Sequence, residues 1–377
     1  MNFYKSLLAT YNAGGVVFAM VIWIIMLIVL KPGITFNSPL KNSTSKGVNM
    51  FVFLFYIVCV LGLHRWDTYH IEAVESGIYD HLEPLHEWLY VCLSNGNRFW
   101  YRIIVFGGAS YIMMHIAKYL KIYNRNFAIV CTLCIVDSMF CEMRGTIGHV
   151  ILLWGYILLI DSSIKQHQVY NRIIGALLIC LSFFLHRSIF ICIIFACLSL
   201  FDFAKKHIIV ISWLLFPVFV LLINSFFPYM LDSFSTFDHG NMGVAESIDF
   251  YGNSDYSVGQ YNLVGLIITG ITNASIYLIF IYTTIRIVFH NIRVDSIYKY
   301  LFRWYYICMY VGLVLSFADV NDWLNRRIMA MALYPMPFVL ARVWNEEKRS
   351  SIWTKMIILF GILGVILSFL IRYRDWV

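Results

Sequence analysis

Long apolar stretches recur from one end of this chain to the other, separated by short polar segments. The hydrocarbon core of a bilayer takes about 20 helical residues to cross, and a backbone in lipid must satisfy its own hydrogen bonds. Hydrophobic residues make up 60% of the 377 positions and charged residues only 13%, whereas a soluble domain carries about 25% charged residues. The sequence therefore predicts an all-α, polytopic integral membrane protein with about twelve transmembrane helices.

The apolar stretches divide the chain into helices that are long enough to span a bilayer. We expect these helices at 13–30, 48–63, 99–117, 126–141, 145–161, 172–185, 188–203, 208–230, 262–288, 302–318, 328–343 and 353–371. Two pairs nearly touch, and each predicts either two tilted helices with a tight turn or one broken segment: 126–141 with 145–161, and 172–185 with 188–203. Residues 1–377 are expected to form a single transmembrane domain with two longer outward-facing loops, at about 64–98 and 231–261.

The net charge of +7 is distributed in short basic clusters between the apolar stretches, which argues against a nucleic-acid partner. Lys and Arg accumulate in the cytoplasmic loops of membrane proteins. With both termini facing outward, every cluster falls on the same side of the membrane: Lys31, Lys41 and Lys46; Lys118, Lys121 and Arg125; Lys165 and Arg172; Lys205 and Lys206; Arg286, Arg293 and Lys299; Lys348 and Arg349. This consistency supports the predicted number of helices, because one miscounted span would invert every later cluster.

The opposite side receives the two longest loops, and both are acidic. The 231–261 loop carries no Lys or Arg, and the acids of the 64–98 loop are Asp67, Glu72, Glu75, Asp80, Glu83 and Glu87. Within the first loop, the stretch 83–93 has apolar residues on one face at helical spacing: Leu85, Trp88, Leu89 and Cys92. This spacing predicts a helix that lies along the membrane surface.

Ionisable side chains gather at the outward ends of the predicted helices. They include His64, Arg65, Asp67, Glu142, Arg144, His186, Arg187, Asp319, Asp322, Arg326 and Arg327. Such groups are costly at membrane depth and mark functional sites, although for any single arginine ordinary interfacial charge is the alternative. Arginine matches phosphate oxygens bidentately, and a carboxylate can act as a general base toward a hydroxyl group. The pattern therefore favours a lipid with a diphosphate headgroup as the ligand.

A metal site is a weaker interpretation of the same region. The first outward loop contains His64, His70, His81 and His86, but their spacing matches no zinc signature. A Gly-rich phosphate loop and a Gly-x-Ser-x-Gly nucleophile turn are both missing from the sequence. We therefore expect neither a metal nor a cofactor.

Short motifs at these outward ends resemble those of the EpsG-type and Wzy-type polymerases of bacterial exopolysaccharide, capsule and O-antigen synthesis. In that family the second helix ends with a Gly and an Arg, then an Asp and a Tyr, and Glu-Pro lies further on. The matching residues here are Gly62, Arg65, Asp67, Tyr69, Glu83, Pro84 and Glu87. The family's Arg at the start of a helix, its later His with a nearby Ser, and its late outward Arg correspond to Arg144, His186, Ser188, and Arg326 or Arg327. The resemblance covers most of the chain.

This resemblance implies a membrane glycosyltransferase. It would move a growing glycan from undecaprenyl diphosphate to a new lipid-linked repeat unit, on the periplasmic or outer face of the bacterial plasma (inner) membrane. The residues that it implies to be catalytic are Asp67, Glu83, Glu87 and His186, with Asp67 or Glu83 as the base and His186 beside the diphosphate. Those implied to bind the diphosphate are Arg65, Arg144, Arg187, Arg326 and Arg327. The expected partners are undecaprenyl-diphosphate-linked oligosaccharides and the bilayer, with a flippase and a chain-length regulator as candidates.

Three other functions are compatible with parts of the pattern. A transporter (flippase) of lipid-linked oligosaccharides would hold the same headgroup with the same arginines, but the sequence has none of the internal repeats common in transporters. A membrane acyltransferase acting on surface glycans would also use a His and an Arg near the membrane face. A structural or assembly subunit would leave the many outward Arg, His and carboxylate residues without a role.

Overall fold

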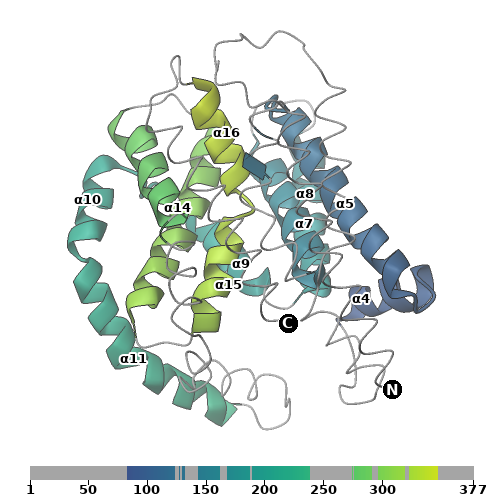
Figure 1. Cartoon of the computed structure of the whole chain (residues 1–377), viewed down its shortest axis with the longest axis horizontal. Coiled ribbons are helices and arrows are strands. Elements are labelled where there is room, and N and C mark those ends of the chain that lie inside the picture. Colours follow the sequence, from purple (N-terminus) through teal and green to yellow (C-terminus); the bar gives the residue numbers. More distant parts are fainter. Residues whose placement is uncertain are drawn as a thin grey trace, which may run out of the picture.

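The computed structural model describes residues 83–123, 127, 130, 131, 143–161, 168–186, 189–237, 274, 276–290, 296–318 and 322–346. Within these ranges all regular secondary structure is helical and no strand occurs (Figure 1). The predicted all-α class is therefore confirmed for the described part of the chain. The predictions made for 13–30, 48–63 and 353–371 lie outside the described residues.

The described helices vary widely in length. In chain order they are α4 (Pro84–Trp88), which continues into the π-helical turn η1 (Leu89–Leu93), α5 (Arg98–Tyr119), α7 (Met143–Ile160), α8 (Gln168–Leu185), α9 (Ile189–Leu198), α10 (Lys206–Leu214), α11 (Phe216–Phe237), an apolar helix Ile276–Phe289 that ends in the π-helical turn η4 (Ile285–Phe289), α14 (Ser296–Phe317), α15 (Asp322–Ala332) and α16 (Met336–Glu346). The helices predicted at 99–117, 145–161 and 172–185 correspond to α5, α7 and α8.

Two predicted spans are wrong as continuous helices. The stretch 208–230 contains α10 and α11, which meet at Leu215 with a bend of 56°. Pro217 explains the break, because a proline has no N–H to donate and its ring clashes with the preceding turn. The stretch 328–343 contains α15 and α16, separated by a turn over 333–335 that ends in Pro335. The residue before a proline is disfavoured in the helical conformation, which explains this second break. Both breaks lie inside apolar stretches, so hydrophobicity alone does not reveal them.

The stretch 83–93, predicted to be helical, forms α4 and η1. Leu89 and Tyr90 are buried, whereas Trp88 is 49% exposed and Cys92 is also exposed. A tight turn then reverses the chain into α5. In this turn Asn95 and Gly96 adopt positive φ angles of 49° and 68°, a conformation that these two residue types tolerate best.

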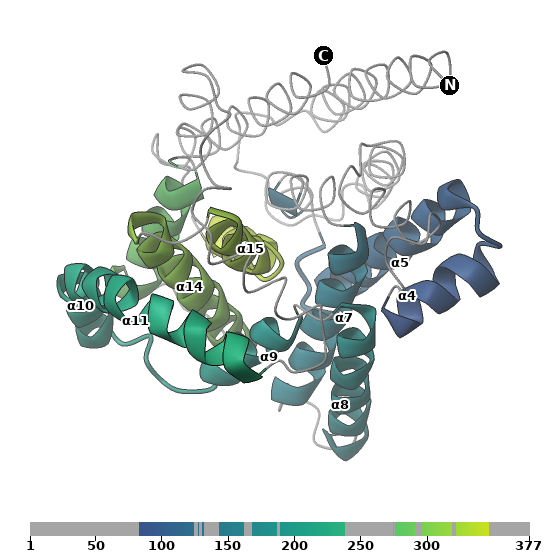
Figure 2. The same cartoon turned by 90° about the horizontal axis from the view of Figure 1, so that it is seen from below.

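The helices form two groups with α9 between them (Figure 2). One group holds α4, α5, α7 and α8, and the other holds α10, α11, α14 and α15; α9 contacts both α7 and α14. The most extensive contact is between α7 and α8. These two helices cross at Gly155 and Gly175, where a Cβ atom added to either glycine would lie 2.7 or 2.6 Å from the carbonyl oxygen of the other. Small residues thus let the two backbones touch.

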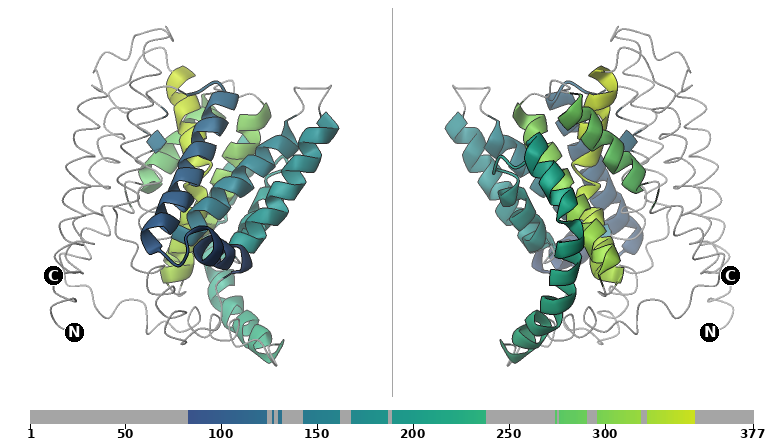
Figure 3. Two further views of the ribbon diagram at one scale, coloured as in Figure 1. Left: turned by 90° about the vertical axis from the view of Figure 1, so that its right-hand side faces the viewer. Right: turned by 90° about the vertical axis from the view of Figure 1, so that its left-hand side faces the viewer.

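The helices run between two opposite ends of the bundle (Figure 3), and these ends carry different side chains. At one end, called here the α4 end, lie α4, the start of α5 and the end of α8. At the other, the basic end, the Tyr119 hydroxyl donates to Asp161 and the Tyr298 hydroxyl donates to the Leu120 carbonyl oxygen at 3.0 Å. Arg303 pairs with Asp202 there. The exposed lysines described at this end are Lys118, Lys121, Lys205, Lys206 and Lys299, and Arg172 is exposed there as well.

Large apolar side chains cover much of the exterior of the described helices. Those at least 50% exposed on α8, α9, α10 and α11 are Val169, Tyr170, Ile173, Leu177, Phe184, Phe190, Ile211, Leu214, Leu221 and Phe226. By length and composition, one described helix, Ser296–Phe317, could cross a membrane, and the bent pair α10–α11 is a second if it counts as one span. Shorter apolar helices are Gly145–Ile160, Val169–Leu185, Ile189–Leu198 and Ile276–Phe289.

Candidate functional site

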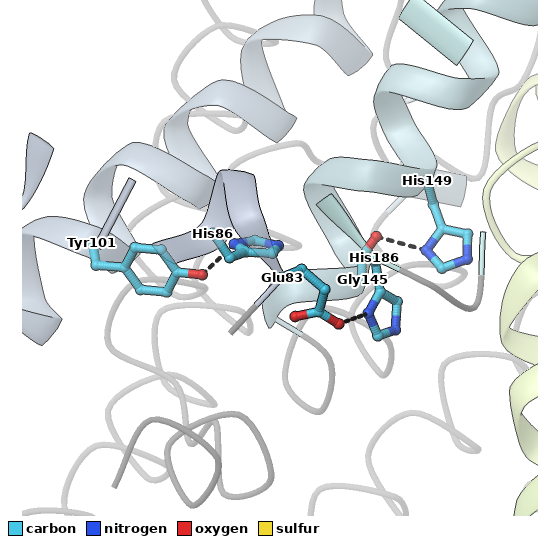
Figure 4. A network of polar contacts seen from close by, with 6 residues as sticks. All are labelled: Glu83, His86, Tyr101, Gly145, His149 and His186. Atoms are coloured by element: carbon cyan, nitrogen blue, oxygen red, sulfur yellow. Dashed lines mark hydrogen bonds and ion pairs between the residues drawn. The ribbon is translucent and has the colours of Figure 1, made fainter. Parts of the chain in front are cut away.

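Two of the residues predicted to be catalytic meet at the α4 end. His186 Nδ1 lies 3.0 Å from Glu83 Oε1, although 103 residues separate them in the chain. Both side chains are largely shielded, with 14% of His186 and 10% of Glu83 exposed. A hydrogen bond between a carboxylate and an imidazole fixes the ring and decides which nitrogen carries the proton. We call these two residues the Glu83–His186 pair (Figure 4).

The local sequence explains why each member of the pair sits at a helix end. Glu83 has an extended backbone (φ −57°, ψ 140°) and precedes Pro84, the first residue of α4. Proline is favoured at this position because its φ angle suits a helix and its missing N–H is not needed. His186 follows the last residue of α8, and its N–H donates to the Ser182 carbonyl oxygen at 3.2 Å. Both side chains therefore project from termini, and α4 contacts α8 where they meet.

A second contact holds α4 in place. His86, one turn after Glu83, is fully buried and hydrogen-bonded through Nδ1 to the Tyr101 hydroxyl of α5. The Tyr101 ring also meets Tyr90 edge to face, with 5.6 Å between the ring centroids. These contacts tie both α4 and η1 to α5. They restrict the position of the Glu83 backbone and hence of its carboxylate.

A second histidine lies behind the pair on α7. The His149 side chain is buried, and its Nδ1–H donates to the Gly145 carbonyl oxygen at 2.6 Å. Its ring stacks on Tyr334 with 4.7 Å between centroids and 6° between planes. The ring centroids of His149 and His186 are 6.3 Å apart. The His149 ring therefore lies beside the ring of His186.

A glycine permits this close approach of α7 to the α8–α9 junction. A Cβ atom at Gly148 would collide with Ile189 Cδ1, and it would lie 3.4 Å from Leu185 Cβ and 3.6 Å from the Ser182 carbonyl oxygen. Ser182 in turn accepts the His186 N–H. A side chain at position 148 would therefore have to displace the end of the Ile189 side chain, whereas its distances to Leu185 and Ser182 are ordinary contacts.

The remaining predicted site residues fall into three groups. Glu87 is half-buried on α4, and its N–H donates to the Glu83 carbonyl oxygen at 2.9 Å. Arg144 lies in the first turn of α7, and Arg326 and Arg327 lie in α15; only their backbones are described. Arg65, Asp67 and Arg187 lie outside the described residues.

The sequence analysis did not single out His149, Tyr101 or Tyr334. His149 carried the clearest signal, since it is an ionisable residue inside the apolar stretch 145–161 and such residues usually have a function. Tyr101 and Tyr334 carried none, because aromatic residues are abundant throughout this chain. Among the described residues, no group of three or more His, Cys, Asp or Glu side chains is arranged to hold a metal ion.

The geometry of the pair suits proton transfer. With Nδ1–H donating to Glu83, the lone pair of His186 lies on Nε2 and can accept a proton from a hydroxyl group. A carboxylate behind the imidazole also stabilises the imidazolium ion that forms.

In comparisons of the chain with family models, curated proteins and solved structures, nothing matched.

Proposed function

We propose that the chain is a polytopic membrane glycosyltransferase that polymerises lipid-linked glycan units, in the manner of the EpsG-type and Wzy-type polymerases that its motifs resemble. The observation that carries this proposal is the Glu83–His186 pair. Both residues belong to those motifs, and they are hydrogen-bonded across 103 residues of sequence. The donor would be a glycan on undecaprenyl diphosphate, and the acceptor would be a hydroxyl group of another lipid-linked repeat unit.

A membrane location is supported by the surface of the described helices. Apolar side chains such as Leu177 (63% exposed), Leu214 (73%) and Leu221 (66%) point outward from α8, α10 and α11. Contiguous exposed apolar surface on this scale marks contact with a membrane or a partner. The lysines gather at the basic end, as the positive-inside rule requires of a cytoplasmic face. The α4 end would then face outward from the bacterial plasma (inner) membrane, and about twelve spans remain the expected number.

In the proposed reaction, His186 is the base, in place of Asp67 or Glu83 as expected from the sequence, and the acceptor hydroxyl group loses its proton to His186 Nε2. Its oxygen then forms a bond to the anomeric carbon of the donor sugar, and the bond between that carbon and the diphosphate oxygen breaks. Glu83 holds the imidazole in the reactive tautomer and balances its positive charge after proton transfer. His149, whose ring stacks on Tyr334, lies beside His186 with 6.3 Å between the two imidazole centroids.

The diphosphate leaving group needs positive charge in the same place. We assign this role to Arg144 in the first turn of α7, with Arg326 and Arg327 of α15 and with Arg65 and Arg187 as further members. The N-terminus of α7 adds unpaired backbone N–H groups, which favour anions. One preorganised donor of this kind is commonly worth about 10²–10³ in rate.

The proposal is tested by replacing the chain in a strain that depends on it for its surface glycan. His186→Gln removes the base, so the glycan ladder on a gel should collapse to single repeat units, in line with a loss of about 10²–10⁴ in rate. His115→Gln is the matched control, because His115 is exposed on α5 and stacks on Tyr111 away from the pair. Immunoblots of the membrane fraction show whether both variants accumulate equally.

The gel also separates the alternative functions. Repeat units trapped on the cytoplasmic face of the membrane, in place of single units on the outer face, would identify a transporter. A ladder of normal length that lacks only an acyl group would identify an acyltransferase. A normal ladder from the His186→Gln strain, at normal protein levels, would exclude the catalytic role assigned to the pair.

A further inference from the structure

An apolar groove lies on the outside of the bundle, away from the Glu83–His186 pair. It has a volume of about 350 Å³ and runs between α10 and the helix Ile276–Phe289. Its lining residues are Ile209, Val210, Trp213, Leu214, Ile281, Thr284, Ile285 and Phe289. The one polar side chain among them, Thr284, is buried and donates its hydroxyl to the Phe280 carbonyl oxygen at 2.9 Å. The walls of the groove can therefore pack against an apolar chain, and they have few polar groups that could hydrogen-bond to water.

The two ends of this groove differ. At the basic end, Lys206 Nζ lies 5.3 Å from the centroid of the Phe289 ring, so a cation bridges the two helices that form the walls. At the other end α10 stops at Leu214, and the chain bends by 56° before α11 continues. Between these limits the groove follows about 12 Å of helix α10, at 1.5 Å per residue.

The charge around the basic end selects the sign of the ligand. Lys206 and His207 are exposed at the start of α10, and Arg286 and His290 stand at the end of the facing helix. Asp202 is the acid nearest along the chain to Lys206 and His207, and it pairs with Lys205 at 3.7 Å and with Arg303. Basic pockets between helices on the cytoplasmic side of a membrane bind anionic lipid headgroups.

We propose that this groove binds one acyl chain of an anionic phospholipid, whose phosphate group contacts Lys206. The apolar walls match the chain, and the cation at one end matches the headgroup. A lipid bound here would also hold α10 against the helix Ile276–Phe289, because it contacts both. The inference rests on the membrane location in the proposed function and is independent of the glycosyl transfer chemistry.

Trp213, in the wall of the groove, allows a direct test. The full chain is placed in nanodiscs of phosphatidylcholine that contain a small fraction of a brominated lipid. In one sample this lipid is brominated phosphatidylglycerol, and in the other it is brominated phosphatidylcholine. Bromine on the acyl chain quenches tryptophan fluorescence on contact. Subtracting the signal of Trp213→Phe isolates the contribution of Trp213. We expect stronger quenching of Trp213 by brominated phosphatidylglycerol than by brominated phosphatidylcholine at the same mole fraction.

Lys206→Gln should reduce this preference about fivefold, the effect of one basic residue at a membrane surface, and Lys206→Arg should retain it. Lys299→Gln is the control, since Lys299 is an exposed lysine of the same end but lies on α14, which forms neither wall of the groove. Equal quenching of Trp213 by the two lipids, with or without Lys206, would overturn the inference. No quenching of any tryptophan would overturn the membrane location itself. Neither measurement requires turnover, so an inactive enzyme would still report on the groove.

Discussion

At the scale of single residues, the account depends on Glu83 and His186 acting as one unit. If the carboxylate works only through the imidazole, removing both should cost no more than removing His186 alone. We expect Glu83→Gln to lower the polymerisation rate in isolated membranes by about 10²-fold. We expect the double variant to match His186→Gln. Additive losses in the double variant would mean that the two side chains act on different steps.

The buried contact between His86 and Tyr101 gives a second prediction at this scale. Tyr101→Phe leaves a buried imidazole without its hydroxyl partner, which should cost about 1–3 kcal/mol of stability. The thermal unfolding temperature of the detergent-solubilised protein should fall accordingly. Tyr111→Phe, on the exposed side of the same helix, should change the stability by no more than about 0.5 kcal/mol, as is usual for surface substitutions, and should leave the unfolding temperature nearly unchanged. Equal unfolding temperatures for the two variants would show that the contact does not hold α4.

The residues of the pair could be chosen from the sequence, but their contact could not. The resemblance to a polymerase family selected Glu83 and His186 from motifs in two distant segments. Their contact depends on α4 reaching the end of α8, and this follows from the burial of His86 against α5. The length of the apolar stretch around His149 predicts a helix but does not show that its histidine lies beside His186.

At the scale of helices, the crossing of α7 and α8 determines where His186 lies. A methyl group at Gly155 would come within 2.7 Å of the Gly175 carbonyl oxygen, and backbone cannot move aside as a side chain can. Gly155→Ala should therefore cost about 1–3 kcal/mol of stability and displace His186, lowering activity as well. Gly108→Ala is the control, because its methyl group would meet only the end of the Ile147 side chain, at 3.2 Å. Thermal unfolding and the polymerisation rate, measured on both variants, check this prediction. Wild-type values for Gly155→Ala would contradict the close crossing.

Hydrophobic length located most of the described helices but not their breaks. The helices α5, α7 and α8 were found because each is one apolar stretch bounded by polar residues. The breaks at Leu215 and at 333–335 occur inside apolar stretches, next to Pro217 and Pro335, where hydropathy does not change. A proline inside an apolar stretch therefore indicates a break more reliably than the length of the stretch indicates a continuous helix.

At the scale of the whole molecule, the account predicts a fixed orientation in the membrane. The turn at Asn95 lies next to the start of α5 at the α4 end, and Lys205 lies at the basic end. Alkaline phosphatase fused after Asn95 should be active, because it requires the oxidising exterior, and the same fusion after Lys205 should be inactive. A green fluorescent protein fusion after Lys205 should fluoresce. The reverse pattern would place the Glu83–His186 pair in the cytoplasm, where the proposed acceptor and donor are not polymerised.

The most direct measurement is polymerisation by the purified chain, reconstituted in vesicles with an undecaprenyl-diphosphate-linked oligosaccharide from the strain that encodes it. The account predicts a ladder of lipid-linked products with release of undecaprenyl diphosphate from the wild type, and none above background from Glu83→Gln or His186→Gln. His115→Gln should give the wild-type ladder. A ladder of undiminished rate from the His186→Gln protein, or no product from a correctly folded wild type, would contradict the account.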